Sequence, residues 1–142
     1  ASIGIEIVNG GHDFGLPPYP DVQIDSVIKL VNGLMQAHGI SPDRVIGHSD
    51  IAVERKDDPG EHFPWWRLEA AGCAQRLSGT AQSADPRADL TRAGYDPDAP
   101  EAAVVTAFQR RHRQACIDGR VDAETAALIR AAAQVHGPAS SG

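Results

Sequence analysis

A histidine and an aspartate ten positions apart stand at the two ends of one loop, in the stretch GHSDIAVERKDDPG at 47–60. A catalytic zinc ion takes three protein ligands, with nitrogen or oxygen among the usual donors, and keeps a fourth position for water. His48 and Asp58 are donors of suitable types. Because Pro59 keeps the end of the loop from being helical, the chain can fold back and bring both side chains to one point. The spacing therefore allows two ligands of a zinc site.

Two further residues have types that a zinc hydrolase needs. Lys56 lies in the same loop and would project toward the same point, where a cation stabilises a developing oxyanion. Glu6 is an acidic residue within the otherwise apolar run SIGIEIV, where burial of a charge is costly unless the charge has a partner or a role. A carboxylate at that place could remove a proton from water bound to zinc.

Taken singly, each of these residues also has an ordinary structural interpretation. A histidine after a strand is commonly a hydrogen-bonded structural residue, a glutamate in a strand commonly faces solvent, and ERKDDPG is typical of a solvated turn. The sequence contains no HExxH and no CxxC motif. A serine hydrolase is disfavoured because Ser49 has no GxSxG setting, and its neighbours His48 and Asp50 cannot form a triad from adjacent positions. The residues alone leave the zinc site and the solvated loop both open.

The elements around the loop predict an α/β fold. β-Branched residues at 2–9 (SIGIEIVN) predict a buried strand, and RVIG at 44–47 predicts a second strand that delivers His48 at its end. Between them, apolar residues at helical spacing predict a helix at 22–38, with Asp21 as its N-cap and Gly39 as its stop. A strand, a helix and a strand in succession predict a mixed sheet flanked by helices.

The remainder of the chain predicts a second, helical unit. A short helix at 64–72 is followed by the small, polar and unpatterned stretch LSGTAQSADP. Three further helical patterns, with Asp122 as a cap for the last, predict a small three-helix domain. The predicted helices lie at 88–93, 100–115 and 123–135, and the predicted domains are 1–76, a linker at 77–86, 87–136 and a disordered tail at 137–142.

Composition excludes some classes of function. Acidic residues outnumber basic ones by 19 to 13, which argues against a nucleic-acid partner. No apolar run approaches the roughly 18 to 20 residues that span a bilayer. Cys73 and Cys116 match no zinc or redox pattern, and we interpret them as two buried thiols.

The motifs SIGIEIVN at 2–9, VIGHSDIA at 45–52 and RKDDPGEHFPW at 55–65 resemble those of the type 2 N-acetylmuramoyl-L-alanine amidases, relatives of the peptidoglycan recognition proteins. The resemblance implies a mixed sheet flanked by helices around one Zn²⁺ ion, and hydrolysis of the amide between N-acetylmuramic acid and L-alanine in peptidoglycan or muropeptides.

The resemblance also implies a role for each of four site residues. His48 and Asp58 correspond to zinc ligands, and Lys56 to the cation that stabilises the oxyanion. Glu6 corresponds to the general base, which later acts as acid toward the leaving amine.

One ligand of the family has no counterpart in this sequence. The family's first zinc histidine belongs to a strand before the IGIE strand, and neither His12 nor His38 matches it. The resemblance therefore implies an N-terminally truncated amidase that lacks its leading strand and holds two of three ligands, which puts activity of this chain in question. The alternative function is a non-catalytic module that binds peptidoglycan or muropeptide.

A second resemblance covers the helical unit. AFQRRHR at 107–113 and DGRVDAET at 118–125 resemble the three-helix peptidoglycan-binding domain. We interpret Phe108 as a core residue, and Arg110, Arg111 and Arg113 as a solvated helix face.

Together the two resemblances imply a monomer of the periplasm or cell envelope. They leave attachment to a membrane or wall to residues that would precede Ala1.

Overall fold

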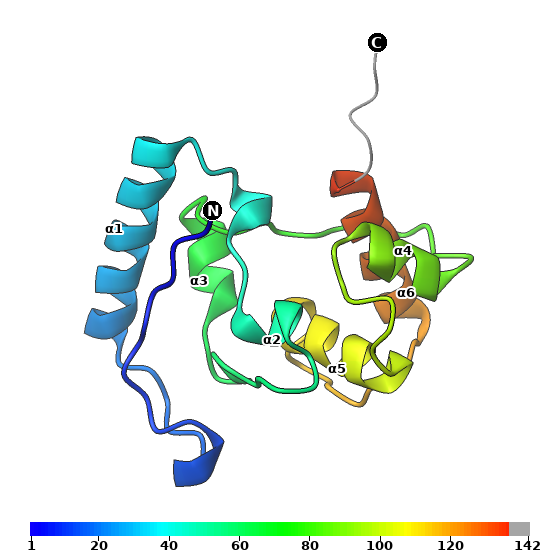
Figure 1. The fold of residues 1–142 in the computed structure, drawn as a ribbon, viewed down its shortest axis with the longest axis horizontal. Coiled ribbons are helices and arrows are strands. Elements are labelled where there is room, and N and C mark those ends of the chain that lie inside the picture. Colours follow the sequence, from blue (N-terminus) through cyan, green and yellow to red (C-terminus); the bar gives the residue numbers. More distant parts are fainter. Residues whose placement is uncertain (137–142) are drawn as a thin grey trace.

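The computed structural model describes residues 1–136, and the predicted disordered tail at 137–142 lies outside this range. Helices joined by extended and irregular segments make up the described part of the chain (Figure 1). These elements are η1 (His12–Phe14), α1 (Asp21–His38), η2 (Pro42–Arg44), α2 (His48–Ile51), α3 (Trp65–Ala70), α4 (Pro86–Arg92), α5 (Glu101–His112) and α6 (Ala123–Val135), where η is a 3₁₀ helix.

The predicted mixed sheet is wrong, because residues 1–136 contain no β-strand. The two predicted strands are extended, except that Arg44 belongs to η2, and no backbone hydrogen bond joins residues 2–9 to residues 44–47. Ile5 and Ile7 instead pack against side chains of α1 and α3. β-Branched residues favour an extended backbone, whereas a strand also needs a neighbouring chain to pair with its N–H and C=O groups. The sequence pattern predicted the extended backbone, but it could not show whether a neighbouring chain lies close enough to pair with it.

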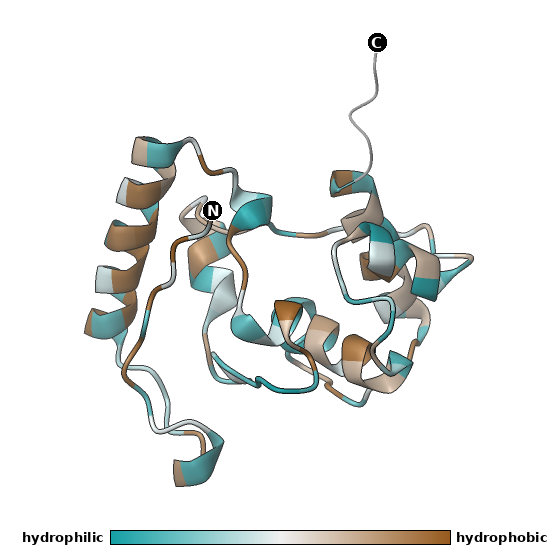
Figure 2. Cartoon of the chain, viewed as in Figure 1, coloured by the Kyte–Doolittle hydropathy of each residue, from teal (hydrophilic) through white to brown (hydrophobic). Residues whose placement is uncertain are grey.

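The first buried cluster joins α1 to α3. Ile24, Val27 and Val31 recur at helical spacing and present one apolar face of α1, and α3 contributes Trp65 and Leu68. Figure 2 shows the apolar residues that recur along α1. The helix ends at Gly39, whose φ of 63° lies in the left-handed region that glycine adopts most readily.

The start of α1 corrects one prediction. Asp21 is not the N-cap, because the helix already begins at Asp21 and Pro20 occupies the capping position without a side-chain hydrogen bond. The carboxylate of Asp21 lies 3.3 Å from Arg67 of α3 instead, and that guanidinium also pairs with Asp25. Charge pairing with α3, rather than capping, therefore accounts for the acidic start of α1.

The second buried cluster joins α4, α5 and α6. Leu90, Val105, Phe108 and Ile129 belong to this cluster, and all four are at most 1% exposed. The helix predicted at 123–135 is observed with these bounds, and the carboxylate of Asp122 accepts the N–H of Thr125 at 2.9 Å, which confirms the predicted cap. The predicted domain boundaries at 76 and 87 stay a prediction.

The helix α5 docks onto the N-terminal half of the chain through two arginines, beside α2 in Figure 1. The side chain of Arg111 is 4% exposed, donates to Glu69 at 2.8 Å and to the carbonyl of Gln75 at 2.9 Å, and lies 4.1 Å above the ring of Trp65. Arg110 pairs with Asp57 and Glu61, as described below.

The interpretation of Arg110, Arg111 and Arg113 as a solvated face is therefore wrong. The side chain of Arg113, 9% exposed, pairs with Asp122 and donates to Thr125 within the helical unit. Most partners of the arginines lie far along the chain, so the pattern of one helix could not show them.

The described residues also test the predictions about the two cysteines and about membrane-spanning segments. Cys73 is buried as predicted, but Cys116 is exposed, and both thiols are free. Among residues 1–136, no helix combines the length and the apolar character that a membrane span requires.

The docking of α5 predicts a large loss of stability in Arg111→Met. The change leaves the carboxylate of Glu69 without its partner and the carbonyl of Gln75 without a donor, so we expect the free energy of unfolding to fall by about 2–4 kcal/mol. Urea denaturation measures this difference.

The matched control is Arg120→Met, at an exposed arginine of the same helical unit. We expect the free energy of unfolding of this variant to stay within about 0.5 kcal/mol of that of the unmodified protein. Equal stability of the two variants would contradict the docking.

Candidate hydrolase site

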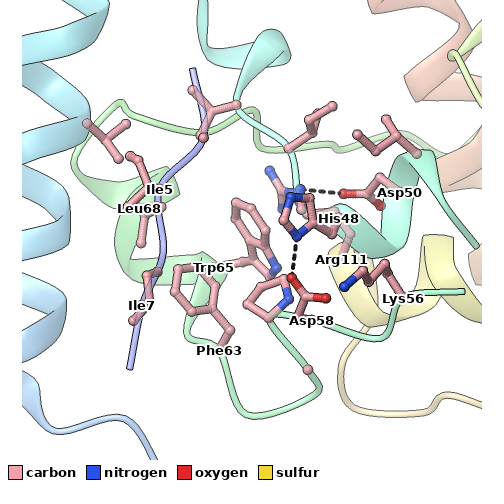
Figure 3. Close-up of a pocket in the computed structure, with 18 of the residues that line it drawn as sticks. Ile5, Ile7, His48, Asp50, Lys56, Asp58, Phe63, Trp65, Leu68 and Arg111 are labelled. Atoms are coloured by element: carbon pink, nitrogen blue, oxygen red, sulfur yellow. Dashed lines mark hydrogen bonds and ion pairs between the residues drawn. The ribbon is translucent and has the colours of Figure 1, made fainter. Parts of the chain in front are cut away.

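A groove of about 1090 Å³ lies between the N-terminal extended segment and the segment that leads into α2. Ile5 and Ile7 line one side of it, and Phe63, Trp65 and Leu68 form an apolar floor (Figure 3). The remaining candidate site residues line the same groove. An open, partly apolar groove with a few polar groups on one side is typical of a ligand site.

The structure brings His48 and Asp58 into direct contact. The Nδ1 atom of His48 lies 2.5 Å from Oδ2 of Asp58, and the two side chains are 49% and 55% exposed. Their backbones are joined as well, because the N–H of Ser49 donates to the carbonyl of Asp58 at 3.0 Å. The two ends of the 47–60 loop thus meet at the groove, with both side chains open to a ligand.

Close packing at the start of α2 fixes how the two ends meet. Gly47 lies directly against Pro59, since a Cβ atom added to Gly47 would stand 2.8 Å from Cδ of the proline ring. The peptide between Asp58 and Pro59 is cis. The hydroxyl of Tyr19 donates to the carbonyl of Pro59 at 2.6 Å and secures the other side of this turn.

A buried carboxylate stands behind the pair. Asp50 is 7% exposed, and its two oxygens accept hydrogen bonds from the N–H of Gly47 at 2.9 Å and from the hydroxyl of Tyr95 at 2.8 Å. Burial raises the pKa of the Asp50 carboxyl above its ordinary value, although both hydrogen bonds and the charge of Arg111 act in the opposite direction. Burial beside Asp50 raises the pKa of Tyr95 well above its ordinary value.

Sequence reasoning missed both Asp50 and Tyr95. A signal for Asp50 was available, because an acidic residue at the third position of a short helix commonly bonds back to the N–H at its start. Tyr95 offered no such signal, since it lies 45 positions further along the chain.

Lys56 and Glu6 both line the groove, but they come from different segments of the chain. Lys56 is exposed, and its amino end points toward Asp58 in Figure 3. Glu6 is exposed on the N-terminal extended segment, so the expected burial of its charge is wrong. In the described structure, no hydrogen bond or ion pair joins Glu6 to His48, Asp58 or Lys56.

The donor types at the groove fit zinc, but their number is small. Imidazole nitrogen and carboxylate oxygen are usual zinc ligands. Within residues 1–136, no group of three or more histidine, cysteine and acidic side chains is placed to hold a metal ion. The 2.5 Å between His48 and Asp58 is the length of a short hydrogen bond, whereas tetrahedral ligands at about 2.0–2.1 Å from zinc stand about 3.3 Å apart. Joint ligation therefore requires the two half-exposed side chains to separate by roughly 1 Å.

Residues 1–61 match the sequence profile of the family described as N-acetylmuramoyl-L-alanine amidase. The N-acetylmuramoyl-L-alanine amidase AmiD of Escherichia coli K12 is 34% identical over 160 residues, which cover 96% of this chain and 58% of that protein. The 1,6-anhydro-N-acetylmuramyl-L-alanine amidase AmpD of Enterobacter cloacae is 42% identical over 69 residues, covering 49% of this chain and 35% of AmpD.

Two solved structures have the same arrangement over most of the chain. One is the complex of AmiD from E. coli with the substrate anhydro-N-acetylmuramic acid-L-Ala-D-γ-Glu-L-Lys, with a TM-score of 0.76, 33% identity, and coverage of 86% of this chain and 55% of that one. The other is AmpDh3 of Pseudomonas aeruginosa, with a TM-score of 0.76, 31% identity, and coverage of 84% and 55%.

The comparisons identify the family of the N-terminal part of the chain. Residues 1–61 belong to the N-acetylmuramoyl-L-alanine amidase family, as their motifs predicted. The chain is homologous to AmiD along nearly its whole length, including the helical unit, and it spans 58% of the length of AmiD.

The close approach of Gly47 to Pro59 predicts that Gly47→Ala damages the site. The added methyl group has to displace the proline ring, so we expect a loss of about 1–3 kcal/mol in the free energy of unfolding and separation of His48 from Asp58. Urea denaturation checks the stability, and the NMR signals of the His48 ring check the contact.

Gly33→Ala is the control, because no atom lies within 4 Å of a Cβ added in the middle of α1. Alanine favours a helix, so this variant should be as stable as the parent or up to about 1 kcal/mol more stable. If Gly47→Ala matched it, the packing at Pro59 would not constrain the loop.

Proposed function

We propose that this chain carries the reactive residues of a zinc-dependent amidase that hydrolyses the amide between N-acetylmuramic acid and L-alanine in peptidoglycan or muropeptides. The observation that carries the proposal is the contact between His48 and Asp58 at the side of an open groove, within the residues that match the amidase family. The substrate in the solved AmiD complex joins anhydro-N-acetylmuramic acid to L-alanine, which supports this substrate class.

Each candidate residue has a role that its position permits. His48 and Asp58 would bind the zinc ion, which when bound would polarise the scissile carbonyl and acidify a water molecule. Lys56, beside Asp58, stabilises the negative charge that develops on the carbonyl oxygen. Glu6, which lines the groove from the N-terminal extended segment, takes a proton from the attacking water and returns it to the leaving amine. Since Glu6 is exposed and unpaired by any described residue, its carboxylate is free to turn toward the scissile bond.

The substrate class also implies where the protein works. Peptidoglycan surrounds the bacterial cell, so we place the protein in the periplasm or cell envelope. We further propose that the helical unit binds peptidoglycan, in keeping with its AFQ and DGRVD motifs. Weak binding of this kind would raise the local concentration of the scissile bond at the groove.

One observation favours a second function, that of a module which binds muropeptide without cleaving it. Two protein donors hold zinc less firmly than the three of a usual catalytic site, and the described residues supply two. The same groove and the same apolar floor would then serve recognition alone.

Zinc binding and substrate cleavage separate these functions. We expect His48→Ala and Asp58→Asn each to weaken zinc binding at least about tenfold, measured by competition with a chromophoric chelator. Glu6→Gln should keep the zinc affinity and lower the release of L-alanyl peptides from muropeptide by about 10²–10⁴-fold.

His38→Ala serves as the control, because this exposed histidine ends α1 away from the loop. It should match the parent in both assays. If the unmodified protein binds muropeptide but releases no peptide in the presence of zinc, the result would support the second function, binding without cleavage. A Glu6→Gln variant with full activity would overturn the assignment of the base.

A further inference from the structure

The helical unit, defined here as residues 86–135, contacts the 47–61 loop at both ends, next to each candidate zinc ligand. We propose that Tyr95 and Arg110 are positioning residues, which hold the backbone on both sides of the loop so that His48 and Asp58 meet at the groove, where both side chains can reach one metal ion. This inference rests on the proposed function, because it concerns the same site. It assigns to the helical unit a role in building the site, beyond any affinity for peptidoglycan.

The first contact holds the start of the loop. The hydroxyl of Tyr95 donates to Oδ1 of Asp50, and the other oxygen of this carboxylate accepts the N–H of Gly47. Gly47 immediately precedes His48, and Asp50 follows two residues later, so the histidine lies between two anchored positions. Asp50 and Tyr95 are both buried, so water cannot easily replace the phenol.

The second contact holds the end of the loop. The guanidinium of Arg110 lies 3.0 Å from Asp57 and 2.7 Å from Glu61, and its side chain is 17% exposed. Asp57 immediately precedes Asp58, so one of two neighbouring carboxylates pairs with Arg110 of the helical unit and the other contacts His48. A guanidinium that pairs with two carboxylates at once is restricted in orientation as well as in distance.

A third contact extends this hold beyond the loop. The side-chain amide of Gln114 donates to the carbonyls of Glu61 at 3.0 Å and Phe63 at 2.9 Å. Phe63 forms part of the apolar floor of the groove. The contacts of the helical unit therefore extend from the start of α2 to Phe63, two residues before α3.

These contacts show that the helical unit does more than a domain that is only linked to the site and binds peptidoglycan. A domain that only raised the local concentration of substrate would need no contact with the loop. Here the charged groups of Arg110 and Arg111 are committed to carboxylates of the N-terminal half, and are not available to a ligand of the helical unit.

The test compares Tyr95→Phe with Arg113→Met in the full chain. Tyr95→Phe keeps the aromatic ring and removes the hydrogen bond to Asp50, and we expect zinc affinity to fall about 10- to 100-fold, as for other residues that orient metal ligands. Arg110→Met should have an effect of the same order, with partial rescue in Arg110→Lys. Arg113→Met breaks ion pairs inside the helical unit, so it should lower stability without changing zinc affinity in the folded protein.

A second readout separates this inference from the proposed function. The NMR signals of the His48 ring should shift in Tyr95→Phe and stay unchanged in Arg113→Met. If His48→Ala weakens zinc binding while Tyr95→Phe leaves both zinc affinity and the His48 signals unchanged, the inference fails and the proposed function stands. If the parent protein binds no zinc, the proposed function fails, and the His48 signals alone decide whether the helical unit positions the loop.

Discussion

The carboxylate of Asp50 is the constraint on which the rest of the site depends. It accepts one hydrogen bond from the backbone just before His48 and another from Tyr95 of the helical unit, and it is buried between them. A buried carboxylate that lost either donor would bear the cost of an unmet hydrogen bond, which is larger than the gain from making one. The two halves of the chain are therefore held in one relative position by a group that neither half can satisfy alone.

The two arginines of α5 add to this constraint in different ways. Arg111 sits above Trp65 and pairs with Glu69, so it joins the helical unit to the buried cluster of α1 and α3. Arg110 reaches the loop itself through Asp57. The supports of the site are thus largely buried, while His48, Asp58 and Lys56 remain open to the groove. This division suits a reactive site, because rigid surroundings position groups that still have to meet a ligand.

Local patterns in the sequence predicted local structure well. The helix at 22–38 was visible in its apolar spacing and its glycine stop, and the cap at Asp122 in its side-chain chemistry. The loop between His48 and Asp58 indicated that the two side chains could meet, and in the structure they are in contact. Family motifs then identified the residues that match the amidase profile.

Other features depend on partners that are distant in sequence. Residues 2–9 were predicted as a strand, yet strand formation depends on a neighbouring chain that no local pattern specifies. A charged helix such as α5 looks like a solvated face until its acidic partners in the loop are placed beside it. For the same reason Tyr95 was missed: its role exists only because the fold brings it to Asp50.

Native-state hydrogen exchange at the amides of Gly47 and Ser49 tests the central claim most directly. Their hydrogens are bonded to Asp50 and to the carbonyl of Asp58, so their protection reports whether the loop is held closed. If the helical unit holds the loop, these amides exchange only through openings that also expose the amides of α5, with the same free energy of opening. Rapid exchange at Gly47 and Ser49 while α5 stays protected would contradict the account.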